Sequence, residues 1–361
     1  MVAASALQQA FREAAPNVGV EVLDVLAVCN SMFRRFYAGG YLGLVRHAPA
    51  AMGWLYDWMD RDRGHLHDQL RVWVQNLNKL PITRFVRQRR PRLIIHTHFL
   101  SAEIVAQMRQ VGEVRCPQVT VTTDYETHRL WVQEPMERYY TATQEGREYL
   151  TKWGAAPERV LVTGIPVRPE FREEMGRAQA RQECELAADL PVVLVLCGGF
   201  GVGPTGALLR ELTSMPIRAQ IVVVTGRNDA LRKRLERQVE HAPQPVHVVG
   251  FTERIHAWMR AADLVVTKPG GLTVAESLAC GLPLVVVNPI PGQETRNSDC
   301  VLEWGAAIKV NNLHLLGYRV SRLLADGNRL ESLRSAACAH GQPNAARTIV
   351  NDALSLLETS I

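Results

Sequence analysis

The sequence predicts an α/β protein of two doubly wound domains, and three observations lead to this. The chain has 361 residues, of which 47% are hydrophobic, a length that suits about two domains with a core each. Short β-branched runs alternate with segments of helical character along most of the chain. Such alternation is typical of right-handed crossover units around a parallel sheet. The 21% of charged residues and the absence of low-complexity tracts argue against disorder and coiled coil.

Two series of predicted strands follow one another. The first comprises residues 20–26, 92–97, 118–124, 138–143 and 159–164. The second comprises PVVLVLCGG from residue 191, AQIVVVTG from 219, PVHVVG from 245, DLVVTKPGG from 263 and PLVVVNP from 283. The last fifty residues have the apolar spacing of helices. We therefore expect an N-terminal domain over residues 1–167 and a C-terminal domain over 168–361, with the last helix packing back on the N-terminal domain.

Composition excludes several classes of protein. The amino terminus lacks the basic start and long apolar core of a secretory signal, and the longest uncharged stretch, 190–209, is interrupted by glycine and proline. Seven scattered cysteines without a CxxC pair suit neither a zinc site nor a disulfide framework. These features predict a cytoplasmic protein.

Two segments have both a structural and a membrane interpretation. Residues 30–63 combine many aromatic side chains with arginines, which is typical either of buried helices or of a patch at a lipid headgroup layer. Five arginines lie between Arg84 and Arg92. They indicate either a solvated helix end or contact with an anionic membrane.

A glycine-rich segment, 197–206, follows an apolar strand and opens a helical stretch, so its backbone N–H groups can face a phosphate. A plain strand-to-helix turn is the alternative. GVGPTG matches GxGxxG, but the next strand ends TGRN without the acidic residue of a dinucleotide fold. A nicotinamide cofactor is thus disfavoured, and no GxxxxGK[ST] motif is present.

The segment 268–283 carries a second constellation, in which Gly270 and Gly271 turn from a strand into a helix bearing Thr273 and Glu276. A carboxylate there can accept bonds from the hydroxyls of a ribose while the helix start faces phosphate, which favours a sugar nucleotide. A surface glutamate is the alternative for Glu276. The loop 289–297 offers polar groups for sugar hydroxyls, or forms a simple turn and helix cap.

The combination of KPGGLTVAESLACGLPLVVVNPIPGQETRN, VVTGRNDAL, VTTDYETHRLW and VTGIPVRPEF resembles the diacylglycerol glycosyltransferases over nearly the whole chain. These include the monogalactosyldiacylglycerol synthases and processive glucosyl relatives. The resemblance implies the GT-B fold, two Rossmann-like domains facing across a cleft. It also implies a UDP-sugar donor bound mainly by the second domain, and a diacylglycerol or similar lipid acceptor at an anionic membrane.

The resemblance also assigns donor-binding roles. It gives Glu276 the ribose, Gly270, Gly271 and Thr273 the diphosphate side, and Gln293 with Glu294 the hexose. The backbone of Phe251 matches the place that meets the uracil, and Gly199 with Phe200 lies in the loop below the diphosphate.

One departure concerns the amino terminus. Members of the family open with a strand and a loop ending in Gly-His before an alanine-rich helix, and this chain starts inside that helix. The first strand and the loop's histidine are not in the sequence. We expect that the start was assigned at an internal methionine, the alternative being a degenerate protein that binds the nucleotide sugar with little turnover.

The reaction implied is inverting transfer of galactose or glucose to the lipid, by an enzyme peripheral to the inner face of the membrane. Backbone amides and helix dipoles can stabilise the departing diphosphate, so we expect no metal and no cofactor. Asp124, after an apolar strand, is the first candidate for the base or for the partner of the base, with a helix cap as the alternative; His128 is the second candidate and His98 the third. A soluble acceptor or an epimerase is the alternative, and nucleic acid is not expected as a partner.

Overall fold

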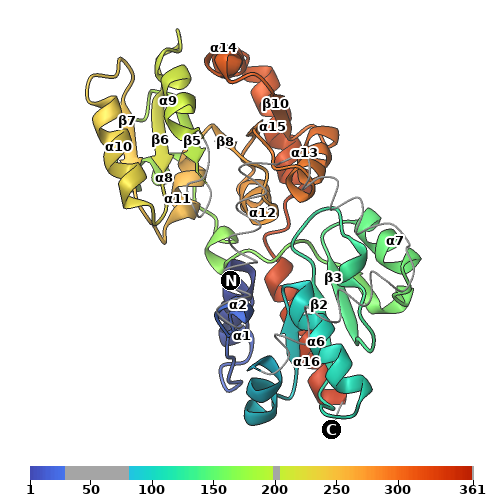
Figure 1. Cartoon of the computed structure of the whole chain (residues 1–361). Coiled ribbons are helices and arrows are strands. Elements are labelled where there is room, and N and C mark those ends of the chain that lie inside the picture. Colours follow the sequence, from blue (N-terminus) through green and yellow to red (C-terminus); the bar gives the residue numbers. More distant parts are fainter. Residues whose placement is uncertain (29–80, 198–203, 360–361) are drawn as a thin grey trace. The chain divides into compact units, whose positions relative to one another are not determined.

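The computed structural model describes residues 1–28, 81–197 and 204–359 (Figure 1). The chain forms two compact units. The first comprises Met1–Pro169, Ile290–Gln293 and Asn344–Ile361, and the second comprises Glu170–Pro289 and Glu294–Pro343. Each unit is built on its own parallel sheet, which confirms the predicted α/β class.

The first unit has a four-stranded sheet in the order β1-β2-β3-β4, with every neighbouring pair parallel. The strands are β1 (Ile94–His96), β2 (Gln118–Val121), β3 (Arg138–Thr141) and β4 (Val160–Val162). The helices of the unit are α1 (Val2–Ala14), α2 (Val25–Val28), α6 (Phe99–Gln110), α7 (Gln144–Lys152) and α16 (Ala345–Thr359), and residues 81–89 are also helical. Short 3-10 helices cover Arg129–Trp131 and Pro157–Arg159.

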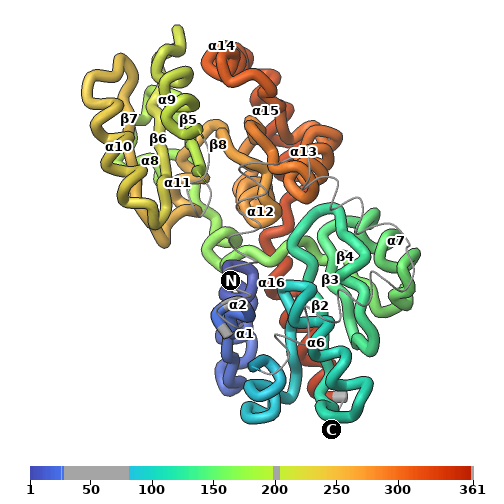
Figure 2. The backbone as a smooth tube through the Cα atoms, in the orientation of Figure 1, coloured from blue at the N-terminus to red at the C-terminus, as the bar shows by residue number. Residues whose placement is uncertain are grey.

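Alternating side chains give both faces of this sheet an apolar layer. On one face Val119 and Val121 of β2 pack with Phe11 of α1 and Ile349 of α16. On the other face Tyr139 joins a cluster under α6 and α7. Helices α1 and α16 lie side by side although they stand at opposite ends of the chain (Figure 2). A parallel sheet covered on both faces in this way explains why its strands contain mostly apolar residues.

Helix α16 is also held by a polar contact. The Tyr140 hydroxyl on β3 donates to Asp352 Oδ2 at 2.7 Å, and Arg138 Nε lies 3.3 Å from the same oxygen. Burial raises the pKa of the Tyr140 phenol, and the Asp352 carboxylate raises it further. The phenol therefore stays protonated and remains a donor at neutral pH.

The strand predicted over residues 20–26 is wrong. Residues 21–24 have no regular structure, and α2 begins at Val25. The Gln8 side chain of α1 donates to the Val20 carbonyl at 2.8 Å. That backbone acceptor is therefore taken by a side chain from a neighbouring helix rather than by a strand partner.

The second unit has a six-stranded parallel sheet in the order β10-β9-β8-β5-β6-β7. The strands are β5 (Val192–Leu196), β6 (Gln220–Val224), β7 (Val246–Val249), β8 (Leu264–Thr267), β9 (Leu284–Val287) and β10 (Ala307–Val310). The helices are α8 (Arg177–Glu183), α9 (Thr205–Thr213), α10 (Asp229–Val239), α11 (Ile255–Ala261), α12 (Gly271–Ala279), α13 (Gln293–Glu303), α14 (Leu316–Ala325) and α15 (Gly327–His340), and two 3-10 helices cover Pro169–Phe171 and Leu313–Leu315. Strands β5 to β9 correspond to the five predicted strands of this unit, whereas β10 was not predicted.

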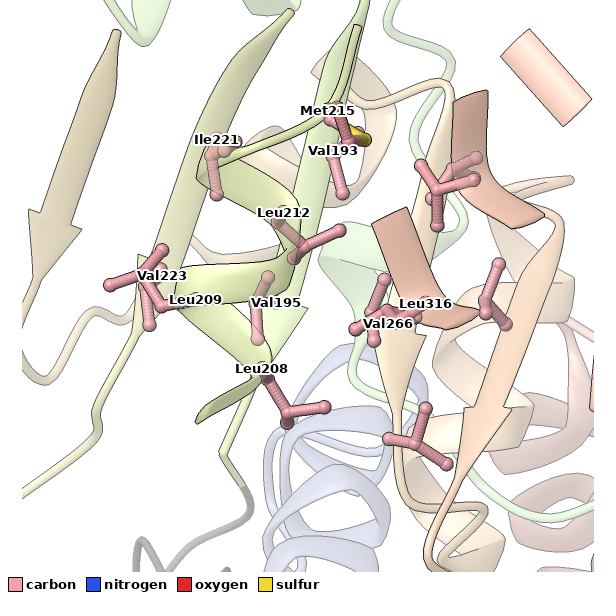
Figure 3. Packing of buried hydrophobic residues seen from close by; sticks show 14 of the residues in the cluster. Val193, Val195, Leu208, Leu209, Leu212, Met215, Ile221, Val223, Val266 and Leu316 are labelled. Carbon is pink, nitrogen blue, oxygen red and sulfur yellow. The ribbon is translucent and has the colours of Figure 1, made fainter. Parts of the chain in front are cut away.

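The core of the second unit lies between this sheet and its helices. Figure 3 shows Leu208, Leu209 and Leu212 of α9 beside the strand residues Val195 and Val223, with Val266 and Leu316 in the same cluster. Strands β8 and β9 are buried along their whole length. The strand order reverses between the neighbours β5 and β8. From β5 the chain continues to β6 on one side, and from β8 it continues to β9 on the other side. This reversal is the topological switch point at which open α/β sheets bind ligands.

Candidate functional site

The carboxyl ends of β5 and β8 flank the switch point of the second unit, so the segments that follow these two strands are the first place to look for a ligand site. After β5 comes the glycine-rich loop. Gly199 and Phe200 lie outside the described residues, as does the aromatic segment 30–63. After β8 the chain passes through Lys268 and Pro269 into α12, all of which is described.

The turn between β8 and α12 is tight. The Lys268 carbonyl accepts bonds from the Gly270 amide at 3.0 Å and from Thr267 Oγ1 at 3.1 Å. Gly270 is the N-cap of α12 and has an extended backbone, φ −65° and ψ 140°, so its conformation does not itself require glycine. A Cβ at this position would meet nothing within 4 Å, so the surroundings of the helix start are open. No side chain caps the helix, and its first N–H groups can therefore face an anion.

Thr273 and Glu276 lie three residues apart on α12, which places them on one side of the helix. Both are half-buried, whereas Val274, Ala275 and Leu278 are buried in the unit. The Thr273 carbonyl accepts a bond from Ser277 Oγ at 2.7 Å within the helix. One side of α12 is thus buried against the unit, and the Thr273 hydroxyl and the Glu276 carboxylate lie on a half-buried side of the helix.

An aromatic platform stands at the same carboxyl edge of the sheet. Phe251 follows β7 and Arg227 follows the neighbouring strand β6. The Arg227 guanidinium lies 4.8 Å from the centre of the Phe251 ring, whose residue is 58% exposed. A large exposed aromatic ring with a cation on its face can stack with a planar, electron-rich group such as a nucleobase. Arg227 was not among the predicted site residues.

The loop after β9 contains Asn288 and Gly292, both with positive φ, of 45° and 100°. Residues Ile290–Gln293 belong to the first unit. There Gln293 Nε2 donates to Asp124 Oδ2 at 2.8 Å. Glu294 is half-buried in the first turn of α13. The loop is therefore more than a turn and helix cap, because it brings Gln293 into contact with Asp124, another predicted site residue.

Asp124 follows β2 in the first unit and is 8% exposed. The backbone around it is fixed at both sides. The Thr122 amide donates to the Tyr140 carbonyl at 2.9 Å, and Thr143 Oγ1 donates to the Tyr125 carbonyl at 3.0 Å. The carboxylate is thus held on a rigid segment.

His128 is also buried in the first unit. It is 4% exposed, and its ring packs edge-on against Phe99, with centroids 5.2 Å apart, and at 5.7 Å from Trp131. A general base must reach the proton that it removes. At 8% and 4% exposure Asp124 and His128 are both buried, so exposure alone does not rank these two of the three predicted candidates.

His96 at the end of β1 and His98 just after it both make hydrogen bonds through their rings. His96 contacts Ser101 Oγ at 2.9 Å and Gln118 Oε1 at 3.0 Å, and burial lowers its pKa to about 4. His98 caps α6 by accepting the Leu100 amide at its Nδ1 atom. Burial, followed by the charge of the chain's amino terminus, lowers its pKa to about 4.

The neutral His98 ring therefore carries its proton on Nε2, because Nδ1 is an acceptor. In this state the ring can donate a hydrogen bond, and its only lone pair on nitrogen is already engaged. This argues against His98 as the base. Within the described residues no three His, Cys, Asp or Glu side chains gather as a metal site would need. That the reaction needs no metal remains a prediction.

Comparison with known proteins places the sequence in a family. Residues 1–167 match the family model described as monogalactosyldiacylglycerol (MGDG) synthase, and residues 192–349 match the glycosyltransferase family 28 C-terminal domain. The processive diacylglycerol β-glucosyltransferase of Bacillus licheniformis is 34% identical over 271 residues, 75% of this chain and 70% of the relative. That of Bacillus subtilis is 34% identical over 269 residues, 74% of this chain and 70% of the relative. The chain belongs to the diacylglycerol glycosyltransferase family.

Solved structures at lower identity show the same fold. MurG of Acinetobacter baumannii has a TM-score of 0.56 at 19% identity, covering 77% of this chain and 78% of its own. MnaA of S. aureus, solved with UDP, has a TM-score of 0.58 at 14% identity, covering 82% of this chain and 83% of its own. At these identities the likeness concerns the fold alone. It confirms the predicted GT-B class for this member of the family.

Proposed function

We propose that this chain transfers glucose or galactose from a UDP-sugar to a hydroxyl of diacylglycerol. The observation that carries the proposal is the family membership, because the curated relatives are named as diacylglycerol glucosyltransferases. The switch point of the second unit supplies groups that suit the donor. The open start of α12 suits a diphosphate, and Glu276 suits the hydroxyls of a ribose.

The remaining donor contacts follow from neighbouring segments. We assign the nucleobase to the carboxyl ends of β6 and β7, where Phe251 is exposed beside Arg227. Thr273 lies one turn before Glu276 and faces the diphosphate in this assignment. Glu294 is assigned to hydroxyls of the hexose.

The chemistry joins an acceptor oxygen to the anomeric carbon. The bond between that carbon and the phosphate oxygen breaks, and UDP leaves with the electron pair. Negative charge grows on the diphosphate during this step, and aligned N–H groups at a helix start stabilise such charge without having to reorganise. The acceptor hydroxyl loses its proton, for which we assign Asp124 as the base. Attack opposite to the leaving group inverts the anomeric configuration.

Docking to an anionic membrane is the second part of the proposal. In the helix over residues 81–89, Ile82 and Val86 are buried against α6. The arginines at positions 84, 87 and 89 of this helix, and those at 90 and 92 just after it, are exposed. Arg87 and Arg89 pair with Glu113 and Glu21. Among the described residues no carboxylate pairs with the other three, so their charge is available for lipid phosphates. No helix within the described ranges is long and apolar enough to cross a bilayer.

The experiment that tests the proposal incubates the protein with radiolabelled UDP-glucose or UDP-galactose and vesicles of phosphatidylglycerol containing diacylglycerol. We expect label in a lipid with the β-anomeric configuration. Vesicles without diacylglycerol are the control for hydrolysis. Label appearing only in free sugar, or on a water-soluble acceptor offered in parallel, would replace the lipid with another acceptor. Flotation with neutral and anionic vesicles tests the membrane part separately.

A further inference from the structure

The contact between Gln293 and Asp124 joins residues that lie 169 positions apart in the sequence. An ionised carboxylate can only accept hydrogen bonds, so the amide must present its NH2 group to Asp124, as it does at 2.8 Å. A hydrogen bond to an ionised group in a nearly buried setting is among the stronger ones in proteins. Asp124 is 8% exposed and Gln293 is half-buried, which meets this condition.

The hydrogen bond from Gln293 acts on the side-chain torsions of Asp124, which the backbone contacts do not set. The chain on both sides of Asp124 is fixed through the amide of Thr122 and the carbonyl of Tyr125. These bonds fix the Cα position, but they leave the torsions of the side chain to be set by other contacts. A donor at Oδ2 restricts these torsions and favours the ionised form of the carboxylate. Both effects are what a general base requires.

We propose that Gln293 is a positioning residue for Asp124, with its amide group holding the carboxylate ionised and correctly turned toward the acceptor hydroxyl. The inference rests on the proposed function, because it takes Asp124 as the base. It differs from a role in binding the hexose, which the family resemblance assigns to Gln293 together with Glu294. A positioning residue lowers kcat when it is lost, whereas a sugar contact also weakens donor binding.

Two substitutions separate these roles. Gln293→Ala removes the donor, and Gln293→Glu keeps the size of the side chain but places a second carboxylate against Asp124. We expect both to lower kcat by about 10- to 100-fold, the range for a lost bond to a charged group, with the KM for UDP-glucose changed less than twofold. If the side-chain oxygen of Gln293 served the sugar, Gln293→Glu would retain much of the activity, because it keeps an acceptor.

The neighbouring residue provides a matched control. Glu294→Ala removes a side chain that we assign to the hexose, and we expect it to raise the KM for UDP-glucose. A double-mutant cycle with Asp124→Asn adds a second criterion. We expect Gln293→Ala to cost less than threefold in that background, whereas Glu294→Ala keeps its full effect.

The outcomes are distinct. A Gln293→Ala variant with raised donor KM and unchanged kcat would overturn the inference, as would equal losses in the wild-type and Asp124→Asn backgrounds. The split between kcat and KM decides the matter even where Asp124→Asn is too slow to measure. Calorimetric binding of UDP to each variant verifies that the protein is folded. If the wild-type protein transfers no sugar to lipid while it binds UDP, the proposed function fails, and that result is separate from any effect of Gln293.

Discussion

Asp263 provides a test of how the second unit supports its switch point. This residue stands directly before β8 and is 7% exposed. Its Oδ2 atom accepts bonds from Arg181 Nη2 on α8 and from the Val192 amide at the start of β5, each at 2.8 Å. Its Oδ1 atom lies 3.0 Å from Arg177 Nη1. One carboxylate therefore ties the two central strands to a helix.

The cost of Asp263→Ala follows from the burial of these partners. The side chains of Arg181 and Asp263 are only 12% and 10% exposed, and breaking a buried pair costs about 3–5 kcal/mol. Arg181 keeps bonds to the carbonyls of Ala261 and Ala188, which reduces the loss. The Val192 amide loses a side-chain acceptor, which adds about 1 kcal/mol. We expect the free energy of unfolding of the second unit to fall by about 4 kcal/mol.

Hydrogen exchange measured by mass spectrometry tests the predicted loss of stability, because it reports on each unit separately. Peptides that contain β5 and β8 should exchange about a thousandfold faster in Asp263→Ala, and peptides from β2 and β3 should be unchanged. Arg177→Ala is the matched control, since the Arg177 side chain is 39% exposed and its pair is worth at most about 1 kcal/mol. Equal effects of the two substitutions, or a loss below about 1.5 kcal/mol for Asp263→Ala, would refute the reasoning.

Three further predictions concern the site and its surroundings. Glu276→Ala should weaken UDP binding about 10- to 100-fold in calorimetry, since a charged acceptor for two hydroxyls is lost; unchanged affinity would remove the ribose assignment. Transfer should continue in EDTA, because helix N–H groups stabilise the diphosphate; complete loss that Mg²⁺ restores would contradict this. Because burial lowers the pKa of His96 to about 4, below its value of 6.5 when unfolded, stability should be complete above pH 6.5 and fall as the pH drops toward 4. In His96→Gln, urea unfolding should depend less on pH over this range.

The strands that could be predicted from sequence are those with a continuous apolar run. β6, β8 and β9 are buried along their length, so every residue is apolar or nearly so, and the pattern is unambiguous. β10 lies at the edge of its sheet, and its middle residues, Ile308 and Lys309, are only half-buried. A four-residue edge strand containing a lysine does not stand out from a helical neighbourhood. For residues 20–26 a strand was predicted where none forms. Their apolar pattern also suits an irregular segment whose Val20 carbonyl accepts a hydrogen bond from the Gln8 side chain.

The site divides in a similar manner. Gly270, Thr273 and Glu276 could be predicted because strand, turn and helix are local, and spacing within a helix fixes which side chains share a side. The Arg227 and Phe251 pair could have been found, since each residue closely follows one of two successive strands, and successive strands of a parallel sheet commonly pair. The bond between Gln293 and Asp124 could not, because no local rule brings together two loops that are 169 residues apart.

The distribution of charge over the proposed groups has a consequence for catalysis. The start of α12 carries its positive potential in backbone dipoles, which do not titrate, whereas the proposed base Asp124 is a carboxylate held by a neutral amide. Stabilisation of the leaving group by the helix start should therefore be independent of pH, and loss of activity on the acid side should report protonation of carboxylates, the base Asp124 and the donor-binding Glu276 and Glu294. Since removal of the amide donor disfavours the ionised carboxylate, the acid limb of the kcat profile should move to higher pH in Gln293→Ala. An acid limb that stays in place would mean that Asp124 is held ionised by groups other than Gln293.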